Sequence, residues 1–468
     1  MARRPRLLFS AFNEFVLSHH DHGLWAYPGS RQTEFNTLDY WVDLARLLER
    51  GRFDLLFFAD VLAPYDIYRG SRDAALRSGM QSPVNDPAVL IPVLAYVTRD
   101  LGFAMTANIL QEPPYTFARK ISTIDHLTRG RIAWNIVTSF LPGAGRNLGH
   151  AGLPSHEERY GRAEDYVAAV YKLWEASWED DAVLSDKARQ IYADPDKVHE
   201  IHHHGPYYDV TGPHLTEPSP QRTPLLFQAA QSDVGIEFAG RHAEILFTSF
   251  PRAAAATNIA KLRGAAVASG RRADQVKIFA GFSFVLGSTE AEASRLARDL
   301  AERQSLESIL TKFSGFWNFD LSLFALNDRV ADILNGDAPA AAALPPLGRQ
   351  MLAAAPEKSW TIERFARWLA SQHVVGTPEA IVDEIAAWQD AGVDGLNIYY
   401  QVSPKTYEDF VNELTPRLTA RGIMQDRYAS GTLRGKIFGR GPYLPAEHPA
   451  RKTREALPGA RLAVTEAA

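Results

Sequence analysis

Short apolar runs alternate with longer amphipathic stretches along most of the chain, which is the pattern of repeated strand–helix units. The runs are nearly continuous, which is typical of parallel strands because both of their faces are covered. Eight of them predict strands at Pro5–Asn13, Phe53–Asp60, Leu101–Ile109, Arg131–Ser139, Leu225–Ser232, Glu244–Ser249, Val276–Leu286 and Gly395–Tyr400. Eight such units predict an α/β fold of the (β/α)8, or TIM, barrel type.

The intervening helices carry recognisable start signals. Asp86-Pro87 and Thr377-Pro378 each place a capping side chain before a proline at the first helical position. Ser155-His156-Glu157-Glu158 predicts a capping box, in which Ser155 accepts from the first turn and Glu158 reaches back. A helix is therefore expected to begin at His156.

Two segments are too long to be simple connections, namely 178–224 before the fifth strand and 290–370 before the eighth. Long connections in compact domains are usually lids or binding loops, so both are expected to cover the C-terminal mouth of the barrel. We predict one barrel domain over residues 1–440. The tail, 441–468, is rich in Pro, Arg and Ala and is expected to be disordered or to lie in a subunit contact.

The amino-acid composition limits the kinds of reaction that the chain can catalyse. An apolar share of 46% and a net charge of -5 describe a globular protein without the basic bias of a nucleic-acid partner. The basic start is too short for a signal peptide and no stretch is apolar enough for a membrane, so a cytoplasmic location is expected. The chain has no cysteine, which excludes thiolate and Fe–S chemistry. Any redox chemistry must therefore come from an added cofactor.

Barrel enzymes place their chemistry at the carboxyl ends of the strands. These positions offer one carboxylate and many neutral hydrogen-bonding groups: Asn13, Asp60, Thr106, Asn108, Thr138, Ser139, Gln231, Ser232, Thr248, Ser249 and Asn397. Such a set suits a large polar cofactor better than acid–base hydrolysis. The alternative that a given residue merely caps the end of the sheet is left open.

A histidine-rich segment after the first strand, His19-His20-Asp21-His22, raises the alternative of a metal-dependent TIM-barrel hydrolase. A divalent ion needs three or four ligands, and the later strand ends carry hydroxyls and amides instead of histidines or carboxylates. We therefore predict no metal site. A second run, His202 to His204, is expected to be a solvated surface loop.

His156 and Tyr160 lie four residues apart, so both are expected on one face of the helix that Ser155 caps. The free backbone N–H groups at that helix end favour an anion, and a phosphate would sit there naturally.

Several longer motifs together make the chain similar to the FMN-dependent, two-component monooxygenases of the bacterial luciferase-like superfamily. The similarity extends over nearly the whole chain and is greatest in the branch of nitrilotriacetate, dibenzothiophene-sulfone and dimethylsulfide monooxygenases. The matching segments are Glu49–Asp60, Leu127–Ser139, His156–Tyr160, Lys172–Trp174, Asp194–His199, Gln228–Ser232, Val375–Glu379 and Gly431–Arg434.

The resemblance implies a (β/α)8 barrel that binds reduced FMN and uses O2 through a C4a-(hydro)peroxyflavin to oxygenate a small organic substrate, such as an organosulfur compound or an amine. It implies a separate NAD(P)H:flavin reductase as partner and a homodimer or homotetramer. The flavin contacts carried over are Asp60, Thr106, His156, Tyr160 and Ser232, and His20 is a candidate for orienting the peroxide or substrate.

The chain departs from the family at Trp25-Ala26-Tyr27-Pro28 and at Asn85-Asp86-Pro87, which border the expected substrate side of the flavin. No relative's substrate is therefore transferred. A flavin-binding barrel without catalysis, like the non-fluorescent flavoproteins of the superfamily, remains a further alternative.

Overall fold

A closed barrel of eight parallel strands forms the centre of the computed structural model, which describes residues 4–20 and 23–455. Each strand pairs in parallel with its neighbours, and the pairing of β10 with β11 closes the ring. The strands are β1 (Leu8–Glu14), β2 (Leu55–Ala59), β3 (Gly102–Asn108), β4 (Ile132–Val137), β9 (Leu225–Ala229), β10 (Ile245–Thr248), β11 (Lys277–Leu286) and β13 (Gly395–Tyr399). All eight predicted strands and the TIM-barrel architecture are confirmed.

The inside of the barrel is filled by one side chain in two along each strand, as the pleat requires. Leu8 and Phe12 of β1 meet Leu55 and Phe57 of β2 there, in a cluster that also holds Phe279. Helix α17 (Leu433–Phe438) closes the amino-terminal end, because its Leu433 and Ile437 belong to the same cluster. The inside of the barrel is therefore a packed core that α17 closes at its amino-terminal end.

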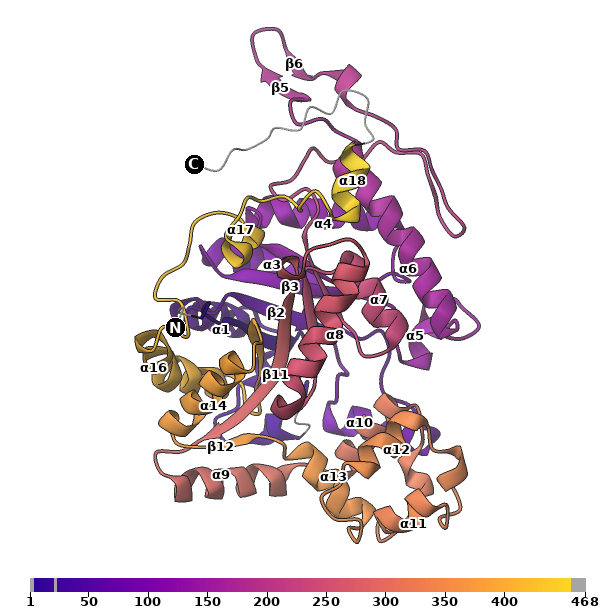
Figure 1. Cartoon of the computed structure of the whole chain (residues 1–468), viewed down its shortest axis with the longest axis vertical. Coiled ribbons are helices and arrows are strands. Elements are labelled where there is room, and N and C mark those ends of the chain that lie inside the picture. The colour runs from indigo at the N-terminus through magenta and orange to yellow at the C-terminus, as the bar shows by residue number, and fades with distance from the viewer. Residues whose placement is uncertain (1–3, 21–22, 456–468) are drawn as a thin grey trace.

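Eight main helices cover the barrel (Figure 1). They are α1 (Leu38–Arg50), α3 (Pro87–Val97), α4 (Pro114–Thr128), α6 (His156–Tyr171), α7 (Asp233–His242), α8 (Ala255–Ala268), α14 (Pro378–Asp390) and α16 (Thr415–Ala420). The predicted caps form, since Asp86 accepts from the Ala88 N–H and Thr377 from the Ala380 N–H. Ser155 likewise accepts from the Glu158 N–H, but the Glu158 carboxylate binds Arg162 instead of reaching back, so the capping box is incomplete.

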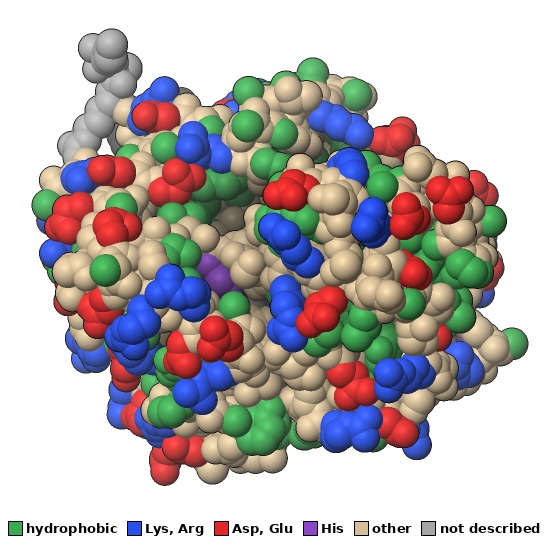
Figure 2. Space-filling view, turned by 90° about the horizontal axis from the view of Figure 1, so that it is seen from below, with side chains coloured by type: hydrophobic (Ala, Val, Ile, Leu, Met, Phe, Trp, Pro, Cys, Tyr) green, Lys and Arg blue, Asp and Glu red, His purple; other side chains and the backbone are tan. Residues whose placement is uncertain are grey.

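The second insertion covers the mouth of the barrel, as expected. It consists of α9 (Glu290–Arg303), α10 (Leu306–Trp317), α11 (Val330–Asn335), α12 (Pro346–Ala353) and α13 (Ile362–Ala370). These helices gather at the lower end of the molecule in Figure 1, near β12 (Val374–Gly376), which pairs in parallel with the last residues of β11. Figure 2 looks onto this end and shows a hollow between charged rims.

The first insertion does not cover the mouth, so that expectation was wrong. Two of its short strands, β5 (Val183–Asp186) and β6 (Ile191–Ala193), lie toward the opposite end in Figure 1. The other two, β7 (His203–His204) and β8 (Asp209–Val210), form a hairpin beside α6, and the Tyr208 hydroxyl next to β8 donates to the Ile109 carbonyl at 3.3 Å. The insertion is held on the outside of the barrel, because Asp165 of α6 accepts from the backbone N–H groups of Tyr207 and Tyr208 at 2.8 Å each.

The histidine run in this insertion is also not uniformly solvated. His203 is buried, with its Nε2 2.9 Å from Oδ1 of Asp165, whereas His202 and His204 are exposed. His203, the middle residue of the run, therefore holds the insertion against α6.

The described part of the tail, residues 441–455, packs on the chain's own barrel, and its expected place in a subunit contact stays a prediction. Helix α18 (Pro449–Glu455) lies against α6 and the π-helical turn that follows it. His448 is fully buried with its Nε2 2.8 Å from the His242 carbonyl oxygen, and Arg454 pairs with Asp180. Residues 456–468 lie outside the described residues. Within residues 4–20 and 23–455, none of the helices combines the length and apolar character that a membrane crossing requires.

Candidate functional site

The mouth of the barrel holds two adjoining cavities. The first, which we call the anion cavity, has a volume of about 580 Å³. All five residues predicted to contact a flavin line it: Asp60, Thr106, His156, Tyr160 and Ser232. Segments that are far apart in the sequence thus bring their predicted site residues to one space, as the common edge of parallel strands requires.

Two helix N-termini meet at one end of the anion cavity. Ser155 caps α6 and Ser232 caps α7, where Ser232 accepts from the Gly235 N–H at 3.2 Å. His156, the first residue of α6, lies with its Nε2 3.2 Å from Oγ of Ser232, which ties the two termini together. Free N–H groups and two helix dipoles therefore face the same place, an arrangement that favours an anion such as a phosphate.

Tyr160 lies beside this pair, with its ring centroid 5.0 Å from that of His156, so the predicted shared helix face is confirmed. Its hydroxyl faces the side chains of Gln228, Thr138 and Ser232, and burial raises its pKa above the usual value. Tyr160 is therefore a neutral hydrogen-bonding group at neutral pH.

Arg159 also lines the anion cavity, and it was missed as a site residue although the motif that was singled out contains it. Its Nη1 donates to the Pro154 carbonyl at 2.7 Å, while the buried Nε has no hydrogen-bond partner among the described residues. A guanidinium remains charged at neutral pH, so Arg159 supplies the positive charge that an anion at this helix end needs.

The opposite end of the anion cavity is less charged. Thr106 of β3 accepts from Nδ2 of Asn135 at 3.0 Å, and Asp60 follows β2. Burial, with a further contribution from Asp86, raises the pKa of Asp60 to about 7, while the Val61 N–H and Lys120 oppose the shift. Asp60 is therefore close to half protonated at neutral pH.

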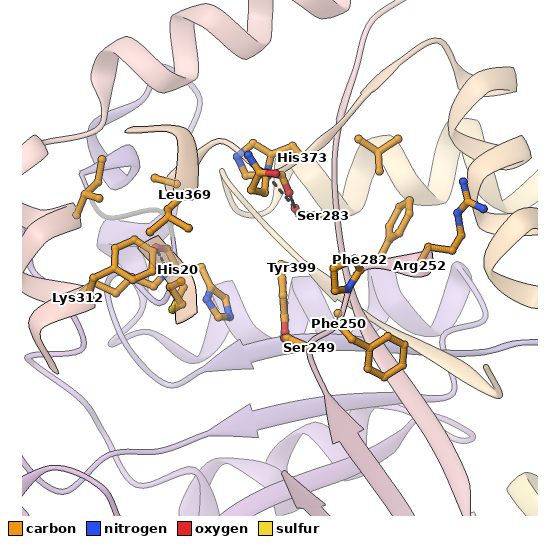
Figure 3. Close-up of a pocket in the computed structure, with 18 of the residues that line it drawn as sticks. His20, Ser249, Phe250, Arg252, Phe282, Ser283, Lys312, Leu369, His373 and Tyr399 are labelled. Carbon is orange, nitrogen blue, oxygen red and sulfur yellow. Dashed lines mark hydrogen bonds between the residues drawn. The ribbon is translucent and has the colours of Figure 1, made fainter. Parts of the chain in front are cut away.

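The second cavity, which we call the aromatic cavity, has a volume of about 610 Å³ and is lined by His20 and by the ends of β10, β11 and β13. The His20 ring stacks on Phe12, with centroids 5.4 Å apart, and lies 4.3 Å from the ring of Tyr399. Figure 3 shows His20 and Tyr399 side by side, with the Tyr399 hydroxyl directed to Ser249. Apolar walls dominate: Phe250, Phe282, Phe313, Leu369, Met351 and Trp388.

Ser249 lines both cavities, so they meet at the Tyr399–Ser249 contact. Tyr399 fits there because Gly281 has no side chain; a Cβ at Gly281 would lie 2.6 Å from the tyrosine oxygen. The second insertion contributes a wall to each cavity, with Phe316 and Leu347 at the anion cavity and Phe313 at the aromatic cavity. No residue of 178–224 lines either one.

Some strand-end residues lie elsewhere. Asn13 is buried and donates to the Tyr407 hydroxyl at 2.8 Å, and Asn397 is buried inside the barrel, so neither lines the two cavities. His22, part of the metal alternative, lies outside the described residues. In residues 4–20 and 23–455, no three His, Asp or Glu side chains are grouped as a metal ion would require.

Comparison with known proteins decides the family. The family model described as luciferase-like monooxygenase matches residues 13–395. The chain belongs to this family. It is similar to the long-chain alkane monooxygenase of Geobacillus thermodenitrificans (strain NG80-2), with 42% identity over 96% of this chain and 98% of that protein. It is also similar to the dimethyl-sulfide monooxygenase of Hyphomicrobium sulfonivorans, with 40% identity over 97% of this chain and 95% of the relative.

Among solved structures, riboflavin lyase with modified FMN and substrate riboflavin superposes with a TM-score of 0.86 at 34% identity, over 96% of this chain and 99% of that chain. Membership of the luciferase-like monooxygenase family makes the chain a flavin-dependent monooxygenase, and the resemblance noted in the sequence is confirmed.

The anion cavity fits a flavin. It offers an anion-binding end, a run of neutral hydrogen-bonding groups, and two buried polar atoms without protein partners, Nε of Arg159 and Oε1 of Gln228. The apolar side chains of Ile136, Val137 and Phe247 complete its lining, as expected for a cavity that takes an aromatic ring system.

Proposed function

We propose that the enzyme is an FMNH2-dependent monooxygenase that transfers one oxygen atom from O2 to a small organic substrate. The flavin phosphate lies between His156, Arg159, Tyr160 and Ser232, and the ring lies toward Asp60 and Thr106. The observation that carries this proposal is the joined pair of helix N-termini at one end of a cavity that contains every predicted flavin contact.

The substrate occupies the aromatic cavity, which meets the proposed ring end of the flavin at Ser249. Its aromatic and aliphatic walls favour an uncharged organic compound, so an organosulfur compound is the first class to test. Arg252, Lys312 and Glu384 also line the cavity, and an amine, which is protonated at neutral pH, is the second class to test. His20 faces this space beside Tyr399 and is placed to orient the substrate or the oxygen. The covering helices α10 and α12 exclude water from the reaction.

A separate NAD(P)H:flavin reductase supplies FMNH2 in this proposal, and the enzyme works in the cytoplasm as a homodimer or homotetramer. A partner is supported by relatives that are named as one component of a multi-component enzyme, such as nitrilotriacetate monooxygenase component A of Aminobacter aminovorans.

Rapid mixing tests the proposed activity. The enzyme is incubated anaerobically with reduced FMN and then mixed with oxygenated buffer, while the near-ultraviolet absorbance of a flavin C4a–oxygen adduct is followed. A long-lived adduct that decays faster with a dialkyl sulfide, and yields its sulfoxide, supports the proposal. Binding of flavin with reoxidation at the uncatalysed rate would instead support a flavin-binding barrel without catalysis.

Arg159→Met is expected to weaken FMN binding at least about tenfold, because a charge-assisted hydrogen bond to the phosphate contributes about 1.5–3 kcal/mol. Affinity for riboflavin, which has no phosphate, should change little. Quenching of flavin fluorescence measures both. Arg162→Met is the matched control on the same helix, since Arg162 pairs with Glu158 and does not line the cavity. Equal losses for FMN and riboflavin would contradict the placement of the phosphate.

Gly235→Ala is expected to weaken FMN binding about tenfold or more, because the new Cβ would lie 2.6 Å from the Tyr160 hydroxyl and 3.0 Å from Oγ of Ser232. Both groups must then move away from the proposed phosphate site. Gly264→Ala in α8 has open space around its Cβ and serves as the control. An unchanged FMN affinity in Gly235→Ala would show that this end of the cavity does not hold the cofactor.

A further inference from the structure

The wall of the aromatic cavity carries a histidine with one ring nitrogen unused by the protein. His373 follows α13 and directly precedes β12, and its side chain lines the cavity. Its Nδ1 lies 2.9 Å from Oγ of Ser283 on β11 (Figure 3). Among the described residues, no hydrogen bond reaches the other ring nitrogen, Nε2. The ring therefore keeps one hydrogen-bonding atom for water or for a bound molecule.

Both the backbone and the ring of His373 are attached to β11. The next residue, Val374, pairs with Phe284, which directly follows Ser283. Oγ of Ser283 contacts the His373 ring and also donates to the Gln372 carbonyl at 3.3 Å. The ring therefore has a defined position in the cavity wall, at the junction between the second insertion and the barrel.

Either tautomer of His373 leaves Nε2 able to bind a ligand. Ser283 has one hydroxyl proton, which it directs either to the Gln372 carbonyl or to Nδ1. In the first case Nδ1 carries the ring proton and Nε2 accepts; in the second case Nε2 carries the proton and donates. A hydroxyl group both donates and accepts, so it is the ligand group that suits both tautomers.

His373 lies at the end of the aromatic cavity that is remote from the anion cavity. The two cavities meet at the Tyr399–Ser249 contact, where the Tyr399 hydroxyl lies against Gly281. Ser283 lies two residues further along β11, which is about 7 Å nearer the outer end, since a parallel strand rises about 3.3 Å per residue. Figure 3 shows the same order, with His373 and Ser283 on one side of Tyr399 and Ser249 on the other. A molecule that reaches from this contact to His373 is therefore elongated.

The size and the charges of the cavity agree with a long, uncharged molecule. Its volume of about 610 Å³ lies in the range of about 300–1,000 Å³ that holds drug-sized ligands, which is much more than a dimethyl sulfide needs. Arg252 donates to both oxygens of Glu384, at 2.7 and 3.2 Å, so these two charges compensate each other. Lys312 donates to the His20 carbonyl at 3.0 Å and lies apart from His373 in Figure 3. These charges give no reason to expect a charged ligand group at His373.

We propose that His373 is a specificity-determining residue, which binds a hydroxyl group at one end of an elongated, otherwise apolar substrate and so directs the other end toward the flavin. The inference deepens the proposed function and rests on it for the position of the flavin. Ser283 orients the His373 ring. The substrate class that follows is an organosulfur compound whose apolar chain ends in a hydroxyl group.

Calorimetric titration of the flavin-free enzyme tests the inference with two probes, hexyl methyl sulfide and its analogue with a hydroxyl group at the end of the hexyl chain. The wild type is expected to bind the hydroxy analogue about fivefold more tightly, as one added hydrogen bond implies. His373→Phe keeps an aromatic ring without nitrogen, so it should lose this preference and bind hexyl methyl sulfide as the wild type does.

Two further variants control for a merely structural role of the ring. His373→Gln places an amide near the position of Nε2 and should keep most of the preference. His204→Phe changes an exposed histidine of the first insertion, which lines neither cavity, and should keep all of it. Equal preference in the wild type and in His373→Phe would overturn the proposal, and so would a wild type that binds neither probe.

A third probe, with a carboxylate in place of the hydroxyl group, checks the charge of the ligand. It should bind the wild type more weakly than the hydroxy analogue. Tighter binding would mean that a cation such as Lys312 receives the end of the chain, and the proposal would fail.

FMN binding separates this inference from the proposed function. If FMN binds, oxidised or reduced, but the preference for the hydroxy analogue is absent, the inference alone fails. If the preference depends on His373 but the enzyme binds no FMN in either state, the proposed function fails, while the ligand specificity of the aromatic cavity is retained.

Discussion

Replacing Arg434 with methionine is expected to lower the free energy of unfolding by about 3–5 kcal/mol, because it leaves the buried Glu244 carboxylate without its partner. Arg434 is 1% exposed and joins α17 to the barrel. Its Nε and Nη2 donate to the two oxygens of Glu244 at 2.7 and 2.9 Å, and further N–H groups donate to the carbonyls of Thr223, Pro224 and Pro442.

Urea denaturation, followed by tryptophan fluorescence, measures this loss as a lower midpoint. Arg427→Met removes an exposed arginine a few residues upstream and should change the free energy of unfolding by less than about 0.5 kcal/mol. Adding Glu244→Gln to Arg434→Met should recover part of the stability, since no unpaired charge then remains. A midpoint like that of the wild type in Arg434→Met would mean that the ion pair does not hold α17 in place.

Glu14→Gln is expected to remove a large pH dependence of stability. Burial raises the pKa of Glu14 to about 8 in the folded enzyme, against 4.5 as the ordinary value. The folded state therefore binds more protons between these values, and stability falls as the pH rises from about 4.5 through about 8. For one such group the fall amounts to about 4 kcal/mol. The variant has no ionising group at this position and should lack that fall.

The measurement is the free energy of unfolding at pH 5, 6.5 and 8.5, compared between wild type and variant. His19 acts in the opposite direction, because burial lowers its pKa and thereby makes stability fall as the pH drops below about 6.5. His19 lies 3.7 Å from Glu14, so the fall between pH 6.5 and 8.5, above the range in which His19 acts, decides the comparison. A difference between the two proteins that is constant across this range would show that Glu14 does not titrate there.

The barrel could be predicted from the sequence because its strands carry a local signal. A parallel strand covered on both faces is a continuous apolar run, such as Phe53 to Ala59, and several of these runs are followed by a capped helix. Caps such as Asp86-Pro87 depend on neighbouring residues alone, so they also appear in the sequence.

The placement of the insertions could not be predicted, because it depends on partners distant in the chain. Composition shows that 178–224 is long, but not that Asp165 holds it on the outside of the barrel through two backbone N–H groups. The tail is similar. Its Pro, Arg and Ala content resembles disorder, yet Arg454 reaches Asp180 and His448 reaches His242.

The candidate site likewise contains residues that the sequence predicts and residues that only the structure reveals. Asp60, Thr106, His156, Tyr160 and Ser232 stand at strand or helix ends, where topology alone brings side chains together, and all five line one cavity. Arg159 lay within a recognised motif, but the sequence does not show that its guanidinium turns into the cavity. Glu14 lies one residue beyond the predicted first strand, and only the folded chain shows that its side chain is fully buried beside Gln81.

Leu433 and Ile437 of α17 fill the amino-terminal end of the barrel, so both cavities of the candidate site are reached from the carboxyl-terminal mouth. In the proposed function, flavin, substrate and product therefore exchange through the same mouth, past Phe316 and Leu347 of the second insertion, which line the anion cavity. Exchange of spent flavin for reduced flavin is then expected to depend on movement of α10 and α12, and the rate of this movement is expected to contribute to turnover.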